Sequence, residues 1–188
     1  VSTMQGIYGH DGNQKLGRQV SITSRQAGTT CPGASTECKT FCYAKKGMFL
    51  RFGLQKKYGE STINIPKKIR PMFRFNVSGD FDTIESIDWA VDLVNKYPNT
   101  KFWAYTRSWN TPLKDKLEEL RALPNMQLFA SVDATMPTPP KNWRIAYVET
   151  DARFTGMECL EQNGKMPDCQ SCGYCFNKPK GNVKFKMH

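Results

Sequence analysis

The sequence predicts an α/β fold, namely an open partial βα barrel of about five mostly parallel strands with a cysteine-rich C-terminal appendage. Two observations carry this prediction. From Met72 to Thr150, short apolar segments alternate with amphipathic helix-like segments, which is typical of a parallel sheet with right-handed crossovers. The chain has 188 residues, too few for a closed eight-stranded barrel, which typically needs roughly 250 residues.

Five segments have the length and apolar character of strands. They are Gln19–Thr23, Met72–Val77, Phe102–Thr106, Met126–Val132 and Arg144–Val148. The polar turn Ser78-Gly79-Asp80 ends the second segment. The proline-rich stretch Met136–Pro140 joins the last two segments, and it cannot be an ordinary helix because proline has no backbone N–H.

Two amphipathic helices are expected between these strands. Asp82 stands where an N-cap belongs, with Glu85 three residues later, as in a capping box. This helix is expected to end near Tyr97-Pro98, and its apolar face consists of Ile84, Ile87, Val91 and Val94. The second helix is expected to have Thr111 as N-cap and Pro112 at its first position, and its apolar face consists of Leu113, Leu117 and Leu120.

The chain is expected to form one compact unit with two parts. Residues 1–152 form the partial βα barrel and carry the first cysteines, and residues 153–188 form a cysteine-rich metal-binding tail packed on the same domain. No window approaches the roughly 18 unbroken apolar residues of a membrane span. The first residues lack the basic start and apolar core of a secretory signal. The expected location is therefore the cytoplasm, with no membrane as a partner.

The seven cysteines form a first group and a second group, which are Cys31, Cys38 and Cys42, then Cys159, Cys169, Cys172 and Cys175. In a reducing compartment, such groups are expected to be metal ligands rather than disulfides. The spacing Cys169-x2-Cys172-x2-Cys175 is that of a bacterial ferredoxin cluster, and Cys159 can supply the fourth ligand. Structural zinc usually takes two separate Cys-x2-4-Cys pairs, so iron and sulfide are favoured and zinc is the alternative.

The first cysteine group, Cys31-x6-Cys38-x3-Cys42, offers only three thiolates. A four-iron cluster held by three thiolates has one iron that can bind a substrate or cofactor. The alternatives are a fourth ligand from His10, an Asp or the second group, or three buried thiols without metal. One cluster shared by both groups is the main rival.

Several polar residues follow the predicted strands directly. In a parallel α/β sheet the ligand lies beyond the carboxyl ends of the strands, so these residues are expected to share one rim with the first cysteine group. They are Ser78, Gly79, Asp80, Arg107, Asp133, Glu149 and Asp151. The plainer alternative is that Asp80 and Asp82 cap a helix and that Arg107 pairs with a neighbouring acid.

The formal net charge of +10 is concentrated in a basic strip from Lys45 to Arg74. The strip contains Lys45, Lys46, Arg51, Lys56, Lys57, Lys67, Lys68, Arg70 and Arg74, with Glu60 as its one acid. Such a strip can receive an anionic partner, either a protein or a nucleic acid. The alternative is a solvated basic face that keeps the protein soluble.

Four segments together carry a family resemblance. They are Cys31-Pro32-Gly33-Ala34-Ser35 through Phe41-Cys42-Tyr43-Ala44, Phe75-Asn76-Val77-Ser78-Gly79-Asp80-Phe81, Tyr105-Thr106-Arg107-Ser108-Trp109 and the closing Cys-x2-Cys-x2-Cys. From about Ser21 to His188, the sequence resembles a bacteriophage iron–sulfur family, the gene product eighty-eight domain. That class is similar to the radical S-adenosylmethionine enzymes, which cleave this cofactor at a three-cysteine cluster in a partial βα barrel.

The resemblance implies specific roles. The first cysteine group would hold the cluster, Phe41 would match the aromatic residue before its last ligand, and the second group would hold an auxiliary cluster. Ser78, Gly79 and Asp80 would bind the methionine amino group, and Arg107 would bind the methionine carboxylate, which a guanidinium fits bidentately. Both gaps in the first group are longer than the usual Cys-x3-Cys-x2-Cys.

The expected function is that of an iron–sulfur protein resembling radical S-adenosylmethionine enzymes. It would carry one or two 4Fe-4S clusters and S-adenosylmethionine, and it would work in the host cytoplasm if a phage encodes it. The alternative is a non-catalytic iron–sulfur protein for electron transfer, for docking to a host protein or for binding nucleic acid. Its anionic partner would meet the basic strip from Lys45 to Arg74.

Overall fold

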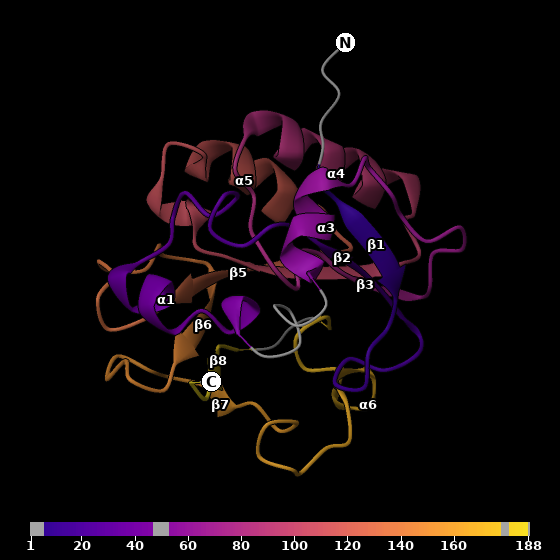
Figure 1. Cartoon of the computed structure of the whole chain (residues 1–188). Coiled ribbons are helices and arrows are strands. Elements are labelled where there is room, and N and C mark those ends of the chain that lie inside the picture. The colour runs from indigo at the N-terminus through magenta and orange to yellow at the C-terminus, as the bar shows by residue number, and fades with distance from the viewer. Residues whose placement is uncertain (1–5, 47–52, 178–180, 188) are drawn as a thin grey trace.

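The computed structural model describes residues 6–46, 53–177 and 181–187, and these ranges contain one eight-stranded sheet (Figure 1). The strands are β1 (Tyr8–Asp11), β2 (Val20–Ser24), β3 (Met72–Arg74), β4 (Lys101–Thr106), β5 (Met126–Val132), β6 (Arg144–Val148), β7 (Met157–Glu158) and β8 (Val183–Phe185). The helices are α1 (Thr36–Phe41), α3 (Leu54–Glu60), α4 (Ile84–Lys96), α5 (Lys114–Arg121) and α6 (Cys169–Cys172), and the 3₁₀ turns are η1 (Tyr43–Lys45) and η2 (Ser108–Asn110).

The sheet has the strand order β1-β2-β3-β4-β5-β6-β8-β7. The β1–β2 pair is antiparallel and the other six pairs of described strands are parallel. The predicted α/β class with a mostly parallel sheet is therefore confirmed. The sheet is open, with β1 and β7 at its edges, and it is not a closed barrel.

The five predicted strands correspond to β2 through β6, and the prediction missed three others. Strand β1 contains Gly9, His10 and Asp11, which have no apolar alternation, and β7 and β8 have only 2 and 3 residues. Such short segments carry too little sequence pattern to be recognised. They become strands because β2 and β6 offer them unpaired edges.

Strand β3 is shorter than the predicted segment Met72–Val77, because it ends at Arg74. Asn76 has a φ of 53°, in the left-handed region, which a strand cannot accommodate. The Phe75 N–H still donates to the Trp103 carbonyl oxygen at 3.1 Å. The chain therefore leaves the sheet here and turns toward Ser78-Gly79-Asp80.

Both long helices begin later than the sequence suggests. Thr83, not Asp82, is the N-cap of α4, and it forms a reciprocal capping box with Ser86. The Asp82 carboxylate instead accepts a hydrogen bond from Arg25 at 2.6 Å. Helix α5 begins at Lys114 because the preceding residues form η2, so the prediction that Thr111 caps this helix is wrong.

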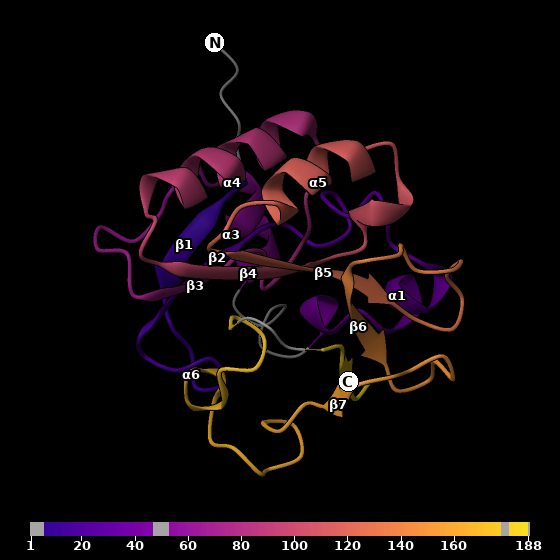
Figure 2. The same ribbon diagram turned by 180° about the vertical axis from the view of Figure 1, so that it is seen from behind.

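The two faces of the sheet are covered by different parts of the chain (Figures 1 and 2). Helices α4 and α5 cover one face and form the main apolar core with it. The C-terminal segment lies across the other face, where Phe176 packs on Trp103 with ring centroids 5.0 Å apart. Because β7 and β8 also join the sheet, this segment is part of it rather than an appendage beside it.

Candidate metal-binding site

All seven cysteines are free and half-buried. The first group lies in the loop between β2 and α3, and the second lies in the C-terminal segment. The two groups are therefore brought to one sheet from opposite ends of the sequence.

Short local structure positions the first cysteine group. Ser35 is the N-cap of α1, and its hydroxyl oxygen accepts a hydrogen bond from the Cys38 N–H at 3.0 Å. The Gly28 N–H donates to the sulfur of Cys31 at 3.4 Å. Burial, with smaller contributions from Asp80, Cys38 and Cys42, raises the pKa of the Cys31 thiol to about 11. The three thiols are thus close enough to influence one another electrostatically.

A buried ion pair ties this loop to the carboxyl ends of the strands. The Arg107 guanidinium donates to the Asp133 carboxylate at 2.6 Å, and the Ser35 hydroxyl donates to the same carboxylate oxygen. The Arg107 backbone N–H donates to Asp80 at 2.8 Å. The loop of the first cysteine group therefore meets residues that follow β3, β4 and β5 on one rim, as predicted.

The same loop approaches the strand ends so closely that two glycines are required. A Cβ at Gly33 would lie 2.0 Å from the Arg107 carbonyl oxygen. Gly79 has a φ of 76°, and a Cβ there would lie 2.6 Å from the Thr30 hydroxyl. A side chain at either position would push the cysteine loop away from the sheet.

The residues assigned to S-adenosylmethionine already have partners within the protein. Buried Asp80 accepts hydrogen bonds from the Phe81 N–H, the Thr106 hydroxyl and the Arg107 N–H at 2.7 to 2.8 Å. Ser78 is buried and bonds to Gln55, and the Arg107 guanidinium pairs with Asp133. A bound methionine carboxylate would have to compete with Asp133, so these assignments stay predictions.

Phe41, the other residue assigned to this ligand, has a different environment. Its side chain is 45% exposed, and the Lys46 ammonium lies 5.6 Å from its ring centroid. Tyr43, on the other side of Cys42, is 39% exposed. The first cysteine group therefore has one side open to solvent.

The second cysteine group converges on one cavity beneath the sheet. All four thiol-bearing residues line it, and the rest of its lining comprises Lys15, Arg74, Tyr105, Met157, Leu160, Glu161, Tyr174, Phe176, Val183 and Phe185. The Cys169 N–H donates to the Lys15 carbonyl oxygen at 2.8 Å, and the Cys159 N–H donates to the Lys184 carbonyl oxygen at 2.9 Å. The β1–β2 connection therefore holds Cys169, and β8 holds Cys159.

Arg144, on β6, holds the part of the C-terminal segment that contains Tyr174, Cys175 and Gly181. Its guanidinium donates to the carbonyl oxygens of Tyr174 and Cys175 at 3.0 Å and to that of Gly181 at 3.1 Å. It also lies 4.2 Å from the ring centroid of Phe129. No sequence pattern predicts this contact, because it joins residues about thirty positions apart that have no shared motif.

The donor set of the second group consists of four thiols around a small cavity. Burial raises the pKa of Cys169 to about 11 and that of Cys175 to about 12, so binding of metal would release protons from these thiols. Within the described ranges, no three His, Cys, Asp or Glu side chains are arranged to hold one metal ion. In a four-iron cluster each of four cysteines binds a different iron, which suits thiols arranged around a cavity. The free volume of this cavity is ≈ 30 Å³, so the thiols would have to move outward around an inorganic core.

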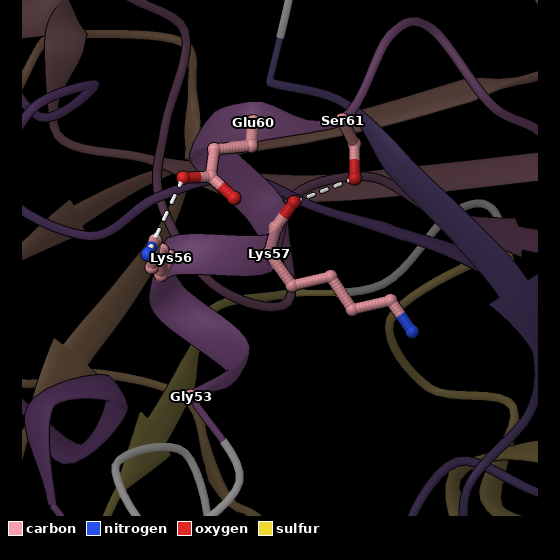
Figure 3. Close-up of a pocket in the computed structure, with 5 residues that line it drawn as sticks. All are labelled: Gly53, Lys56, Lys57, Glu60 and Ser61. Carbon is pink, nitrogen blue, oxygen red and sulfur yellow. Dashed lines mark hydrogen bonds and ion pairs between the residues drawn. The ribbon is translucent and has the colours of Figure 1, made fainter.

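The basic strip is not one continuous surface. Arg70 pairs with Asp11 at 3.2 Å, Arg74 lines the cavity of the second cysteine group, and Arg51 lies outside the described residues. Lys45, Lys46, Lys67 and Lys68 are exposed. A shallow hollow of ≈ 390 Å³ lies over α3 (Figure 3), where Glu60 pairs with Lys56 at 3.8 Å and offsets its charge.

No helix in the described part of the chain is long and apolar enough to cross a membrane.

The fold and the site together define a mixed α/β protein with two groups of free cysteines on one mostly parallel sheet. The chain belongs to the family described as Gene product 88, whose model matches residues 60–178. This match includes the whole second cysteine group and begins after the first. The family name carries no cofactor or activity.

Two phage proteins are similar to this chain. The Gene 88 protein of Mycobacterium phage D29 is 26% identical over 214 residues, covering 90% of this chain and 88% of the relative. The Gene 88 protein of Mycobacterium phage L5 is 27% identical over 218 residues, covering 93% of this chain and 89% of the relative. No solved structure matches. The predicted relation to a bacteriophage family is confirmed.

Proposed function

We propose that the protein is an iron–sulfur protein with two clusters, one on each cysteine group. The observation that carries the proposal is the convergence of four free thiols, Cys159, Cys169, Cys172 and Cys175, on one cavity. The Cys-x2-Cys-x2-Cys spacing supports iron over zinc. Such clusters supply one-electron redox chemistry when they are bound.

The chain's own residues would hold the second group and keep water away from it. Arg144 and the Lys15 carbonyl orient the backbone around Cys169 and Cys175. Phe176 and Phe185 form part of an apolar wall. A wall of this kind limits solvent access and thereby influences the redox potential.

A second candidate function is the reductive cleavage of S-adenosylmethionine at the first cysteine group. It is favoured by a group of only three cysteines at the carboxyl ends of parallel strands, with Phe41 and Tyr43 exposed beside it. Anaerobic reduction of the loaded protein with S-adenosylmethionine should then release 5'-deoxyadenosine, measured by chromatography. Absence of both binding and release leaves electron transfer, or docking to a partner, as the role of the clusters.

Iron and sulfide counting on anaerobically purified protein tests the main proposal. Wild type should contain about eight irons, four for each cluster, with broad absorption in the visible range. Cys172→Ala and Cys38→Ala should each lose about half of the iron, because each removes a ligand of one cluster. Ser171→Ala, at an exposed neighbouring position, is the matched control and should keep all of it.

Three results would contradict this two-cluster assignment. A folded wild-type protein without iron removes the proposal altogether. Zinc in place of iron, found by elemental analysis, leaves a structural metal only. Loss of all iron from each cysteine variant indicates one shared cluster instead of two.

A further inference from the structure

We propose that Arg74 is the counter-charge of the second cysteine group, which raises the reduction potential of the cluster that this group holds. This inference rests on the proposed function, since it concerns the bound clusters. It assigns a role to Arg74, a cation of the basic strip that lines an internal cavity and is therefore not a contact for an external partner.

The strand geometry directs Arg74 away from the helices. Phe73 is fully buried in the core beneath α4 and α5, and neighbouring residues of a strand point to opposite faces. Arg74 is in register with Ile22 and Trp103, which belong to the apolar cluster on the opposite face. On that face, Arg74 lines the cavity together with all four cysteines of the second group.

Arg74 has no acidic partner among the described residues. Its Nε atom is buried and has no hydrogen-bond partner, and none of the ion pairs found in the described ranges includes it. Its guanidinium carbon lies 5.0 Å from the ring centroid of Tyr105, which lines the same cavity. A half-buried cation without a counter-charge is costly, and thiolates holding a cluster would supply the missing negative charge.

The physical consequence concerns reduction. An added electron makes a cluster more negative, and a nearby fixed positive charge in a poorly solvated site stabilises that state. Removal of the charge should therefore make reduction of the second group's cluster harder. A change of shape without a change of charge should have little effect.

The test is anaerobic potentiometric titration of both clusters, followed by electron paramagnetic resonance, in wild type and three variants. Arg74→Met should make reduction of the second group's cluster at least tenfold less favourable, which is about 59 mV for a one-electron couple, and should leave the potential of the first group's cluster unchanged. Arg74→Lys keeps the charge and should keep most of the wild-type potential. Arg70→Met removes an equal charge four residues away, where Arg70 pairs with Asp11, and should change neither potential.

The outcomes separate this inference from the proposed function. Wild type without iron overturns both. Loaded Arg74→Met with an unshifted potential at the second group's cluster, or with equal shifts at both clusters, overturns the counter-charge only. Where Arg74→Met fails to hold iron, Arg74→Lys decides: wild-type iron and potentials support the role of charge, and an equal loss of iron shows that the side chain acts by packing.

Discussion

The ionisation of Asp80, a residue of the rim at the strand ends, affects the stability of the fold. Its side chain is buried at the end of the turn after β3, and three donors point at its carboxylate. Burial outweighs these donors and raises its pKa from 3.8 to about 6. At neutral pH the group is therefore mainly ionised, and Thr106 and Arg107 hold the charged form in place.

This raised pKa predicts a pH dependence with a definite sign. Between about pH 4 and pH 6 the folded protein retains a proton that the unfolded chain releases, so the contribution of Asp80 to the free energy of unfolding falls as the pH rises. The fall should total about 3 kcal/mol and end above about pH 6. Urea unfolding of wild type and Asp80→Asn at several pH values measures it as the difference between the two proteins.

The comparison with Asp80→Asn is needed because other acids change the free energy of unfolding in the opposite direction with pH. Asp133 and Asp151 have lowered pKa values, so their stabilising contributions are present above the usual carboxyl pKa and are lost as the pH falls below it. These contributions are common to both proteins and cancel. A difference between wild type and Asp80→Asn that stays constant from pH 4 to pH 7 would contradict the assignment.

At single residues, the sequence could predict position but not pairing. The strand-end rule placed Asp80, Arg107 and Asp133 on one rim, and they do meet there. Arg107 pairs with Asp133 because β4 and β5 are neighbouring strands and because Ser35, from another loop, donates to the same carboxylate. The order of residues along the sequence does not show which side chains of neighbouring strands and loops come together in space.

Strand prediction succeeded where the segment itself is strongly apolar. Strands β5 and β6 have the predicted bounds, because their short, mostly apolar segments are typical of strands covered on both faces. Helices α4 and α5 were found, but α4 begins later because Thr83 is its N-cap, and α5 begins later because Thr111 instead ends η2. Asp82 could not be recognised as a partner of Arg25, since the two lie 57 positions apart.

Among the elements, β6 holds the segment of the second cysteine group through Arg144. Hydrogen bonds to charged groups stabilise by about 1.5 to 3 kcal/mol each, and Arg144 makes several to the carbonyls of this segment. Arg144→Ala should therefore loosen the segment from Cys159 to Asn177 and remove its iron while the first group retains iron. Hydrogen exchange should become faster in that segment and stay unchanged in α4.

Arg121→Ala is the matched control for this variant. Arg121 also lies over an aromatic ring, that of Trp143 at 5.3 Å, and donates to one carbonyl oxygen, but it does not contact the cysteine segment. It should leave the iron content and the exchange of residues 159–177 unchanged. Equal losses in both variants would mean that β6 responds to general destabilisation and that Arg144 has no special role.

For the whole molecule, the division of the sheet into two faces explains how the cysteines are distributed in the sequence. The central α/β part, between the two groups, builds the core under α4 and α5 and needs no cysteine. The loop after β2 and the C-terminal segment supply thiols from the two ends of the chain. Arg74 belongs to the middle of the sequence, and its position on β3 lets it line the cavity of the second group.

Contacts within the protein leave fewer cations of the basic strip available to an external partner. Arg70 is paired and Arg74 lies in the cavity, so the exposed lysines Lys45, Lys46, Lys67 and Lys68 are the proposed contacts for an anionic partner. Contacts of this kind weaken as salt is added. Replacement of all four by Ala should therefore lower the salt concentration at which the protein elutes from immobilised heparin, used here as a model polyanion.

The control for this prediction removes the same net charge elsewhere. Lys96, Lys114, Lys141 and Lys165 are also exposed, and their replacement by Ala lowers the net charge by an equal amount. If the strip is a binding surface, this control should elute close to wild type, because the potential near a polyanion is set by local charges within about a Debye length of ~10 Å. Equal displacement of both variants would show that heparin responds to total charge, and the strip would then be a solvated face without a partner.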